Sequence, residues 1–280
     1  METLLSSVDE LSAKKIFDAF SRAAKRSLGQ NFLFDEKINR KIVSVAGDLT
    51  GKTITEIGPG PGGLTMEILR HPIKKMYVIE FDRHWSDVWR NLSRLFDGKL
   101  EVIEQDALKF DFGSIAPNVI ISNLPYNIST QLLLKLLKEF DRYERLVLMF
   151  QKEVADRLYA VPSTKSYGRL SVLSQWKSRV EKAFDLEPGS FFPPPKVRST
   201  VVKFTPYPRN QSFDNFNLFS DLLTAAFTHR RKNVVKSLSK FCIDAKQILQ
   251  ELGYGPNTRA EEISVENYTK FIHIFEAIYT

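Results

Sequence analysis

Asn123, Pro125 and Tyr126 are the residues of this chain whose types and spacing most clearly suggest chemistry, and they follow the apolar run 118–122. Proline has no N–H for a β-ladder, so a strand must end here. The asparagine oxygen and a carbonyl freed by the turn can each accept one N–H of a planar aromatic amine. These two hydrogen bonds would favour a pyramidal nitrogen and set the direction of its lone pair. The tyrosine ring can stack on a base, worth about 1–3 kcal/mol in single-strand binders. Asn-Leu-Pro-Tyr thus indicates a nucleobase site, although alone it also fits a turn that starts a helix.

A glycine loop, Glu56–Thr65, follows another apolar run and precedes a helical pattern. Glycines let a backbone turn sharply and approach a ligand without a side chain between them. Gly58, Gly60 and Gly63 satisfy the G-x-G-x-x-G spacing of dinucleotide sites. The loop alone therefore fits either a nicotinamide dinucleotide or S-adenosylmethionine, and a purely structural turn is the simpler alternative.

Two acids lie at the ends of two further strand-like runs. Glu80 lies near the end of the run 75–82, where a carboxylate can accept hydrogen bonds from both hydroxyls of a ribose. Asp106, beside Ala107, ends the run 100–106 and can accept from an adenine amine. Each acid alone could be an ordinary solvated strand end. Ligand-compatible groups at successive strand ends favour an adenosine-containing cofactor.

The elements that must position these residues alternate between short β-branched runs and amphipathic helical stretches. The strand-like runs are residues 53–58, 75–82, 100–106, 118–122 and 145–151. This alternation predicts an α/β fold with a doubly wound parallel sheet, in which ligands bind beyond the carboxyl ends of the strands. We expect three parts: an N-terminal helical extension (residues 1–26), the α/β domain (27–207) and a small all-helical domain (208–280).

Composition narrows the possible classes of protein. The 280 residues carry a formal charge of +7, which favours a polyanionic partner. The single cysteine, Cys242, excludes an internal disulfide framework, and the four histidines lack metal-ligand spacing, so we expect no metal. No apolar run is long enough to span a bilayer. We expect a cytoplasmic protein that binds no membrane, with Cys242 in its core.

Two basic segments, residues 22–26 and 230–240, could hold the phosphates of a polyanionic partner. In the second, lysines recur at every fourth residue from Lys232 to Lys240, a spacing that places helical neighbours about 5–6 Å apart. An ordinary solvated lysine face is the alternative for these lysines. The residues expected to bind these phosphates are Arg22, Lys25, Arg26, Arg230, Arg231, Lys232 and Lys236.

Eight stretches of the chain, in order, resemble the rRNA adenine N6,N6-dimethyltransferase family of the KsgA type: SLGQNFLFD, EIGPGPGGLT, VIEFD, QDALKFDF, NLPYNIST, FQKEVADRL, FFPPPKVRSTVVKF and HRRKNVVKSL. The resemblance implies the Rossmann-like fold of class I S-adenosylmethionine methyltransferases. It implies dimethylation of N6 of two adjacent adenosines in the 3′-terminal hairpin loop of small-subunit (16S-type) rRNA, linked to maturation of the subunit. The implied partners are this rRNA and the immature small subunit, with no DNA, and the implied state is a monomer.

The resemblance also assigns roles to residues. Asn31 and Leu33 should close over the cofactor, and Asn123 should touch both the cofactor and the target N6. Phe191 should contact the target base on the face opposite Tyr126. Pro125 should shape the turn between Asn123 and Tyr126. The expected cofactor-binding set is Asn31, Leu33, Gly58, Gly60, Glu80, Asp106 and Asn123.

Two alternatives remain open beside this reading. An Erm-like methyltransferase of large-subunit rRNA shares the same motifs, so only the RNA substrate separates the two. An assembly or RNA-binding factor with dispensable catalysis belongs to a different class, and the intact set of site residues argues against it. A nicotinamide-dependent dehydrogenase fits the glycine loop but leaves Asn-Leu-Pro-Tyr unexplained.

Overall fold

The structure is a computed structural model that describes residues 11–20, 30–207, 215–229 and 232–279. The chain divides into two compact units. The α/β unit contains Met1–Ala155 and Glu181–Pro206, and the helical unit contains Asp156–Val180 and Tyr207–Thr280. The helical unit thus takes in residues 156–180, which lie before the boundary near Tyr207 that the sequence suggested.

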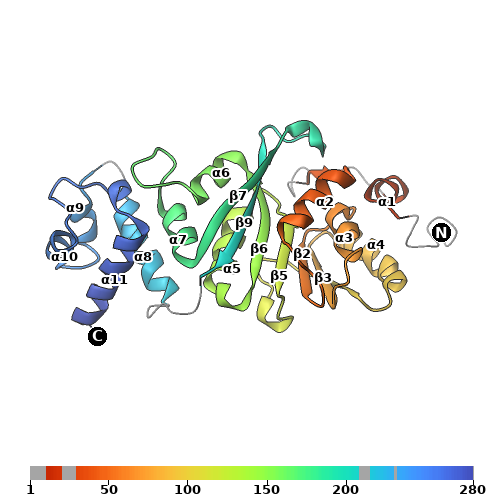
Figure 1. Cartoon of the computed structure of the whole chain (residues 1–280), viewed down its shortest axis with the longest axis horizontal. Helices are drawn as coiled ribbons and strands as arrows, with labels where there is room; N and C mark the ends of the chain where they lie inside the picture. Colours follow the sequence, from red (N-terminus) through yellow and green to blue (C-terminus); the bar gives the residue numbers. More distant parts are fainter. Residues whose placement is uncertain (1–10, 21–29, 208–214, 230–231, 280) are drawn as a thin grey trace. The chain divides into compact units, whose positions relative to one another are not determined.

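The α/β unit is built on a seven-stranded sheet with the strand order β4-β3-β2-β5-β6-β9-β7 (Figure 1). The strands β2 to β6 run parallel, whereas β9 is antiparallel to β6. This arrangement confirms the expected doubly wound α/β fold. The strands are β2 (Thr53–Ile57), β3 (Lys75–Glu80), β4 (Leu100–Glu104), β5 (Val119–Asn123), β6 (Arg145–Gln151), β7 (Ser178–Leu186) and β9 (Ser199–Pro206).

Helices cover both faces of this sheet. Side chains from one face, such as Val78 and Ile121, form a single apolar cluster with residues of the first three helices after β1. Ile120 and Leu148 are fully buried as well, and because successive side chains of a strand point to opposite faces, the other face is also covered. The helices of this unit are α2 (Glu36–Val45), α3 (Gly63–Leu69), α4 (Arg83–Ser93) and α5 (Ser129–Lys138); α6 (Lys152–Leu158) begins in it.

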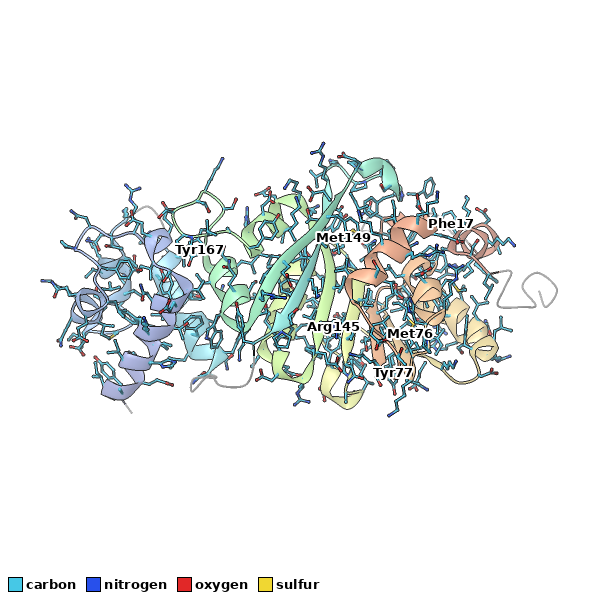
Figure 2. The ribbon with its side chains drawn as sticks, viewed as in Figure 1. Phe17, Met76, Tyr77, Arg145, Met149 and Tyr167 are labelled. Carbon is cyan, nitrogen blue, oxygen red and sulfur yellow. The ribbon has the colours of Figure 1, made fainter. Side chains whose placement is uncertain are left out.

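The described part of the N-terminal extension is a short helix, α1 (Ala13–Phe20). Its Phe17 ring (labelled in Figure 2) lies 5.7 Å from the Phe32 ring and 5.6 Å from the Phe192 ring. These two phenylalanines pair across a two-stranded antiparallel sheet of β1 (Phe32–Leu33) and β8 (Phe191–Phe192). The rest of the helix expected over residues 1–26 lies outside the described residues.

The helical unit confirms the expected run of helices at the end of the chain. Its core includes Trp176 and Phe219, whose ring centroids lie 4.3 Å apart, and Tyr167 (labelled in Figure 2), whose hydroxyl donates to the Ile263 carbonyl at 2.9 Å. Cys242 is buried, as predicted. The helices are α7 (Arg169–Lys177), α8 (Phe216–Phe227), α9 (Val234–Leu238), α10 (Ala245–Glu251) and α11 (Val265–Tyr279).

The lysine helix expected after residue 230 is shorter than the spacing suggested. Asn233 caps its start by accepting from the Val235 N–H at 2.7 Å, and α9 ends at Leu238. Of the three regularly spaced lysines, only Lys236 lies within it, so a continuous phosphate-spaced face is not formed. Across the described residues, no helix is long and apolar enough to cross a bilayer, and no cluster of three or more possible metal ligands occurs.

Candidate functional site

A pocket lies beyond the carboxyl ends of β2, β3 and β5. Residues 30–33, the glycine loop, Glu80, residues 105–108 and residues 123–128 line it. All seven expected cofactor residues are on its wall, together with Pro125 and Tyr126. Phe191 is not among the lining residues.

The glycine loop is shaped by close packing against two aromatic rings. Gly60 has a positive φ of 52°, and a Cβ placed on it would meet the Phe32 ring at 2.9 Å. A Cβ on Gly62, whose φ is 89°, would lie only 2.0 Å from Trp89. The indole N–H of Trp89 donates to the Gly60 carbonyl at 2.7 Å and holds the loop in place. Gly62 lies outside the G-x-G-x-x-G pattern, so the sequence did not single it out.

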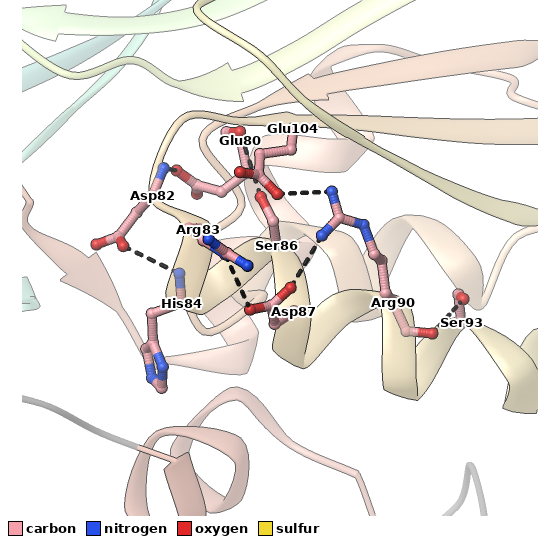
Figure 3. Close-up of polar contacts among 9 residues, drawn as sticks. All are labelled: Glu80, Asp82, Arg83, His84, Ser86, Asp87, Arg90, Ser93 and Glu104. Atoms are coloured by element: carbon pink, nitrogen blue, oxygen red, sulfur yellow. Dashed lines mark hydrogen bonds and ion pairs between the residues drawn. The ribbon is translucent and has the colours of Figure 1, made fainter.

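Glu80 ends β3 as a buried carboxyl that lines the pocket. Its Oε1 accepts from the Asp82 N–H at 2.8 Å, and its Oε2 accepts more weakly from the Gly60 N–H at 3.4 Å (Figure 3 shows the contacts that follow β3). Burial outweighs these contacts and raises the pKa of Glu80 to about 7. The group is therefore close to its titration midpoint at neutral pH, and ligand hydroxyls that donate to it would favour its charged form.

Glu56 is a second buried acid on the pocket wall, and the sequence analysis gave it no role. The Thr65 hydroxyl donates to its Oε2 at 2.5 Å. Burial, reinforced by the nearby charge of Glu80, raises the pKa of Glu56 to about 8. An acid inside a strand of β-branched residues, directly before the glycine loop, was the available sequence signal.

The loop after β4 carries Asp106, and Phe81, which follows β3, is a further aromatic residue on the pocket wall. The Asp106 Oδ1 accepts from the Leu108 N–H at 2.9 Å, which makes a tight turn of the pocket-lining loop. Phe81 also lines the pocket while 64% of its surface is exposed, which is unusual for a large apolar side chain. Sequence reasoning missed Phe81, although it directly follows Glu80.

The Asn123 side chain has a defined orientation. Its Nδ2 donates to the Asn31 backbone carbonyl at 3.0 Å. Oδ1 is therefore the amide atom that remains to accept a hydrogen bond from a ligand. Two residues from distant motifs thus meet directly in the pocket.

The turn after Asn123 starts a helix, as the simpler interpretation of Asn-Leu-Pro-Tyr expected, and its role toward a nucleobase stays a prediction. The Pro125 carbonyl accepts from the Ile128 N–H at 3.2 Å, and α5 begins at Ser129. The Tyr126 hydroxyl lies 2.5 Å from the Ser199 hydroxyl, and burial raises the pKa of the tyrosine. Ser199 belongs to the stretch FFPPPKVRSTVVKF, so this stretch contacts Tyr126 through its serine.

Phe191 is buried and does not line the pocket. In β8 it pairs with Leu33, is only 4% exposed and joins the apolar cluster beneath the sheet. Since neighbouring side chains of a strand point to opposite sides, Phe192 is the exposed ring, at 52%. Phe191 is therefore a core residue in this structure, and its expected role opposite Tyr126 stays a prediction.

The expected RNA-binding residues are only partly described. Lys232 and Lys236 are exposed on the helical unit. Five others, Arg22, Lys25, Arg26, Arg230 and Arg231, lie outside the described residues. Their role stays a prediction.

Comparisons with known proteins agree on one family. The model of the family described as ribosomal RNA adenine dimethylase matches residues 21–277. The chain is 43% identical over 256 residues to ribosomal RNA small subunit methyltransferase A of Rhodospirillum rubrum, covering 91% of this chain and 88% of that protein. The protein of the same name from Ruegeria sp. is 40% identical over 270 residues, covering 94% and 96%.

Two solved structures are similar in fold. A dimethyladenosine transferase from Plasmodium falciparum has a TM-score of 0.76 and 29% identity, covering 88% of this chain and 98% of that one. The 23S rRNA methyltransferase ErmE has a TM-score of 0.66 and 21% identity, covering 88% and 100%, and this likeness shows the fold alone. Together they confirm the methyltransferase fold. Since the family model and the relatives each span nearly the whole chain, the chain belongs to the ribosomal RNA adenine dimethylase family.

Proposed function

We propose that the chain transfers methyl groups from S-adenosylmethionine to N6 of two adjacent adenosines in the 3′-terminal hairpin loop of small-subunit rRNA. The observation that carries the proposal is the tether of Asn123 to Asn31, because it presents an amide oxygen inside the pocket where the cofactor residues meet. Two relatives that span most of the chain are named small-subunit rRNA methyltransferases.

The residues of the pocket fit this cofactor. Glu80 presents carboxylate oxygens for ribose hydroxyls, and Asp106 can accept from the adenine amine. Phe81, exposed on the pocket wall, offers an apolar ring on which the adenine can lie. Gly58 has a positive φ of 66° and leaves the methionine end close to the backbone. When bound, the sulfonium supplies the methyl group.

At the target base, the protein chiefly orients the amine. Asn123 Oδ1 accepts one N–H of N6, and the ring of Tyr126, held by Ser199, stacks on the base. An accepted N–H favours a pyramidal nitrogen whose lone pair is directed along the line of attack. No general base is required, because the proton on N6 becomes acidic only after attack and can then leave to solvent. In the second transfer the monomethylated amine keeps a single N–H, which Asn123 can still accept.

The substrate is best reached as single-stranded RNA. The target base has to leave its stack to enter the pocket, and this costs least in a loop. We place the reaction on the immature small subunit in the cytoplasm, with the enzyme acting as a monomer. The net charge of +7 suits this polyanionic partner.

The deciding experiment supplies labelled S-adenosylmethionine to the protein with unmodified small subunits, large subunits or free rRNA, and resolves the nucleosides by mass. We expect N6,N6-dimethyladenosine in small subunits and its loss in Asn123→Ala. Label only in large-subunit rRNA would favour the Erm-like alternative. Tight subunit binding without label would favour an assembly factor.

A further inference from the structure

Lys135 makes an unusual set of contacts behind the pocket. From α5, its Nζ donates to the backbone carbonyls of Ala107 at 3.1 Å, Leu108 at 2.8 Å and Phe110 at 2.5 Å. An ammonium group has three N–H donors, and all three are used here. The three acceptors belong to one short loop that directly follows Asp106.

The surroundings of Lys135 favour these contacts over water. The side chain is half-buried, and desolvation lowers its pKa, opposed by the carboxylates of Glu139, Asp106 and Asp111. Its ammonium also lies 5.4 Å from the centroid of the Phe112 ring. Lys138, one turn further along the same helix, is exposed. Lys135 is therefore placed to hold the loop, while its neighbour is an ordinary surface lysine.

The loop has two sides with different partners. Asp106 starts it and turns it: its backbone carbonyl accepts from the N–H groups of Lys109 at 2.9 Å and Phe110 at 3.0 Å. Residues 105–108 line the pocket, while the carbonyls of residues 107, 108 and 110 accept hydrogen bonds from Lys135. Removing the ammonium would take away these three hydrogen bonds and free the loop to rearrange.

We infer that Lys135 is a positioning residue: by holding three carbonyls of the loop 106–110, it fixes the Asp106 carboxylate where it accepts from the adenine amine of the cofactor. The inference rests on the proposed cofactor role of Asp106. It assigns Lys135 to recognition of the adenine edge, and not to the reacting atoms.

The test compares the affinities of S-adenosylhomocysteine and of S-inosylhomocysteine, its deaminated analogue, which lacks the exocyclic amine. The wild type should prefer the adenine compound by at least about tenfold, the effect of losing a hydrogen bond to a charged group. In Lys135→Met, which keeps the length and the apolar stem, this preference should fall to about threefold or less. Lys138→Met is the matched control and should keep the wild-type preference.

Steady-state kinetics supply a second readout. Lys135→Met should raise KM for S-adenosylmethionine, while kcat at saturating cofactor and KM for the RNA stay near wild type. A variant that binds both compounds more weakly but keeps the full preference would overturn the inference, because the lysine would then be merely structural. If Lys135→Met does not fold, Lys135→Gln replaces it, and a wild-type preference in that variant would overturn the inference equally.

Failure of the proposed function would be recognised separately. A protein that methylates no RNA, yet prefers the adenine compound in a Lys135-dependent way, would refute the function and leave the inference standing. If Asp106→Ala retained the preference of the wild type, the role of Asp106 would be wrong, and the inference would fall with it.

Discussion

Glu56→Gln should remove a pH-dependent loss of stability that the buried carboxyl imposes on the folded chain. The side chain is 3% exposed and is hydrogen-bonded by Thr65. A glutamine of the same shape can still accept from the Thr65 hydroxyl, but it never carries a charge. The substitution therefore isolates the cost of ionising this one group.

The sign and the size of this pH-dependent loss of stability follow from the pKa of Glu56, which burial raises from 4.5 to about 8. Because the folded-state pKa is raised, the contribution of this acid to stability is fully present below pH 4.5 and is lost as the pH rises through about 8. At about 1.4 kcal/mol per pKa unit, the loss has a ceiling of roughly 4–5 kcal/mol. Between pH 5 and pH 8 the wild type should lose roughly 3 kcal/mol relative to Glu56→Gln.

The assay is urea unfolding of the wild type and of Glu56→Gln without cofactor, at four pH values from about 5 to about 8. The difference in unfolding free energy between them should change steadily in favour of the variant as the pH rises. Glu101→Gln, the same change at an exposed position of β4, is the control and should show a nearly constant difference. Parallel curves for the wild type and Glu56→Gln would refute the reasoning, since Glu56 would then ionise as freely when folded as when unfolded.

Three further predictions concern the pocket. Gly62→Ala should destabilise the protein by roughly 2–4 kcal/mol in thermal or urea unfolding, because its Cβ would overlap Trp89. The control Gly98→Ala, at φ 73° with open space around it, should cost only about 1–2 kcal/mol. Equal losses in the two variants would show that backbone strain alone is responsible. Ser199→Ala should lower kcat by about three- to tenfold with unchanged cofactor affinity, because Tyr126 loses its hydrogen-bond partner. Ser199→Thr, which keeps the hydroxyl, should retain activity. An undiminished kcat in Ser199→Ala would contradict the proposed anchoring of Tyr126. The affinity for S-adenosylhomocysteine, measured by calorimetry, should fall as the pH drops through about 7, because protonated Glu80 accepts fewer ribose hydrogen bonds. If the carboxylate is responsible, the affinity of Glu80→Gln should depend little on pH.

Local patterns in the sequence were enough to predict five of the seven strands of the sheet and the place of the pocket. Strands and helices differ in their local period, so the runs at 53–58 and 145–151 identified strands within a residue or two of β2 and β6. Parallel strands then bring their carboxyl ends to one edge, and this rule alone brings Glu80, Asp106 and Asn123 together. Their roles toward cofactor and base stay predictions that the experiments above address.

Contacts between distant segments decided the rest. The pairing of β1 with β8 buries Phe191 and exposes Phe192, although the two rings are neighbours in sequence. Trp89 makes Gly62 necessary from 27 positions away, a spacing that no local pattern encodes. Only the fold brings the Lys135 ammonium to three carbonyls, and only the fold raises the pKa of Glu56, because desolvation depends on what surrounds a side chain and not on its sequence neighbours.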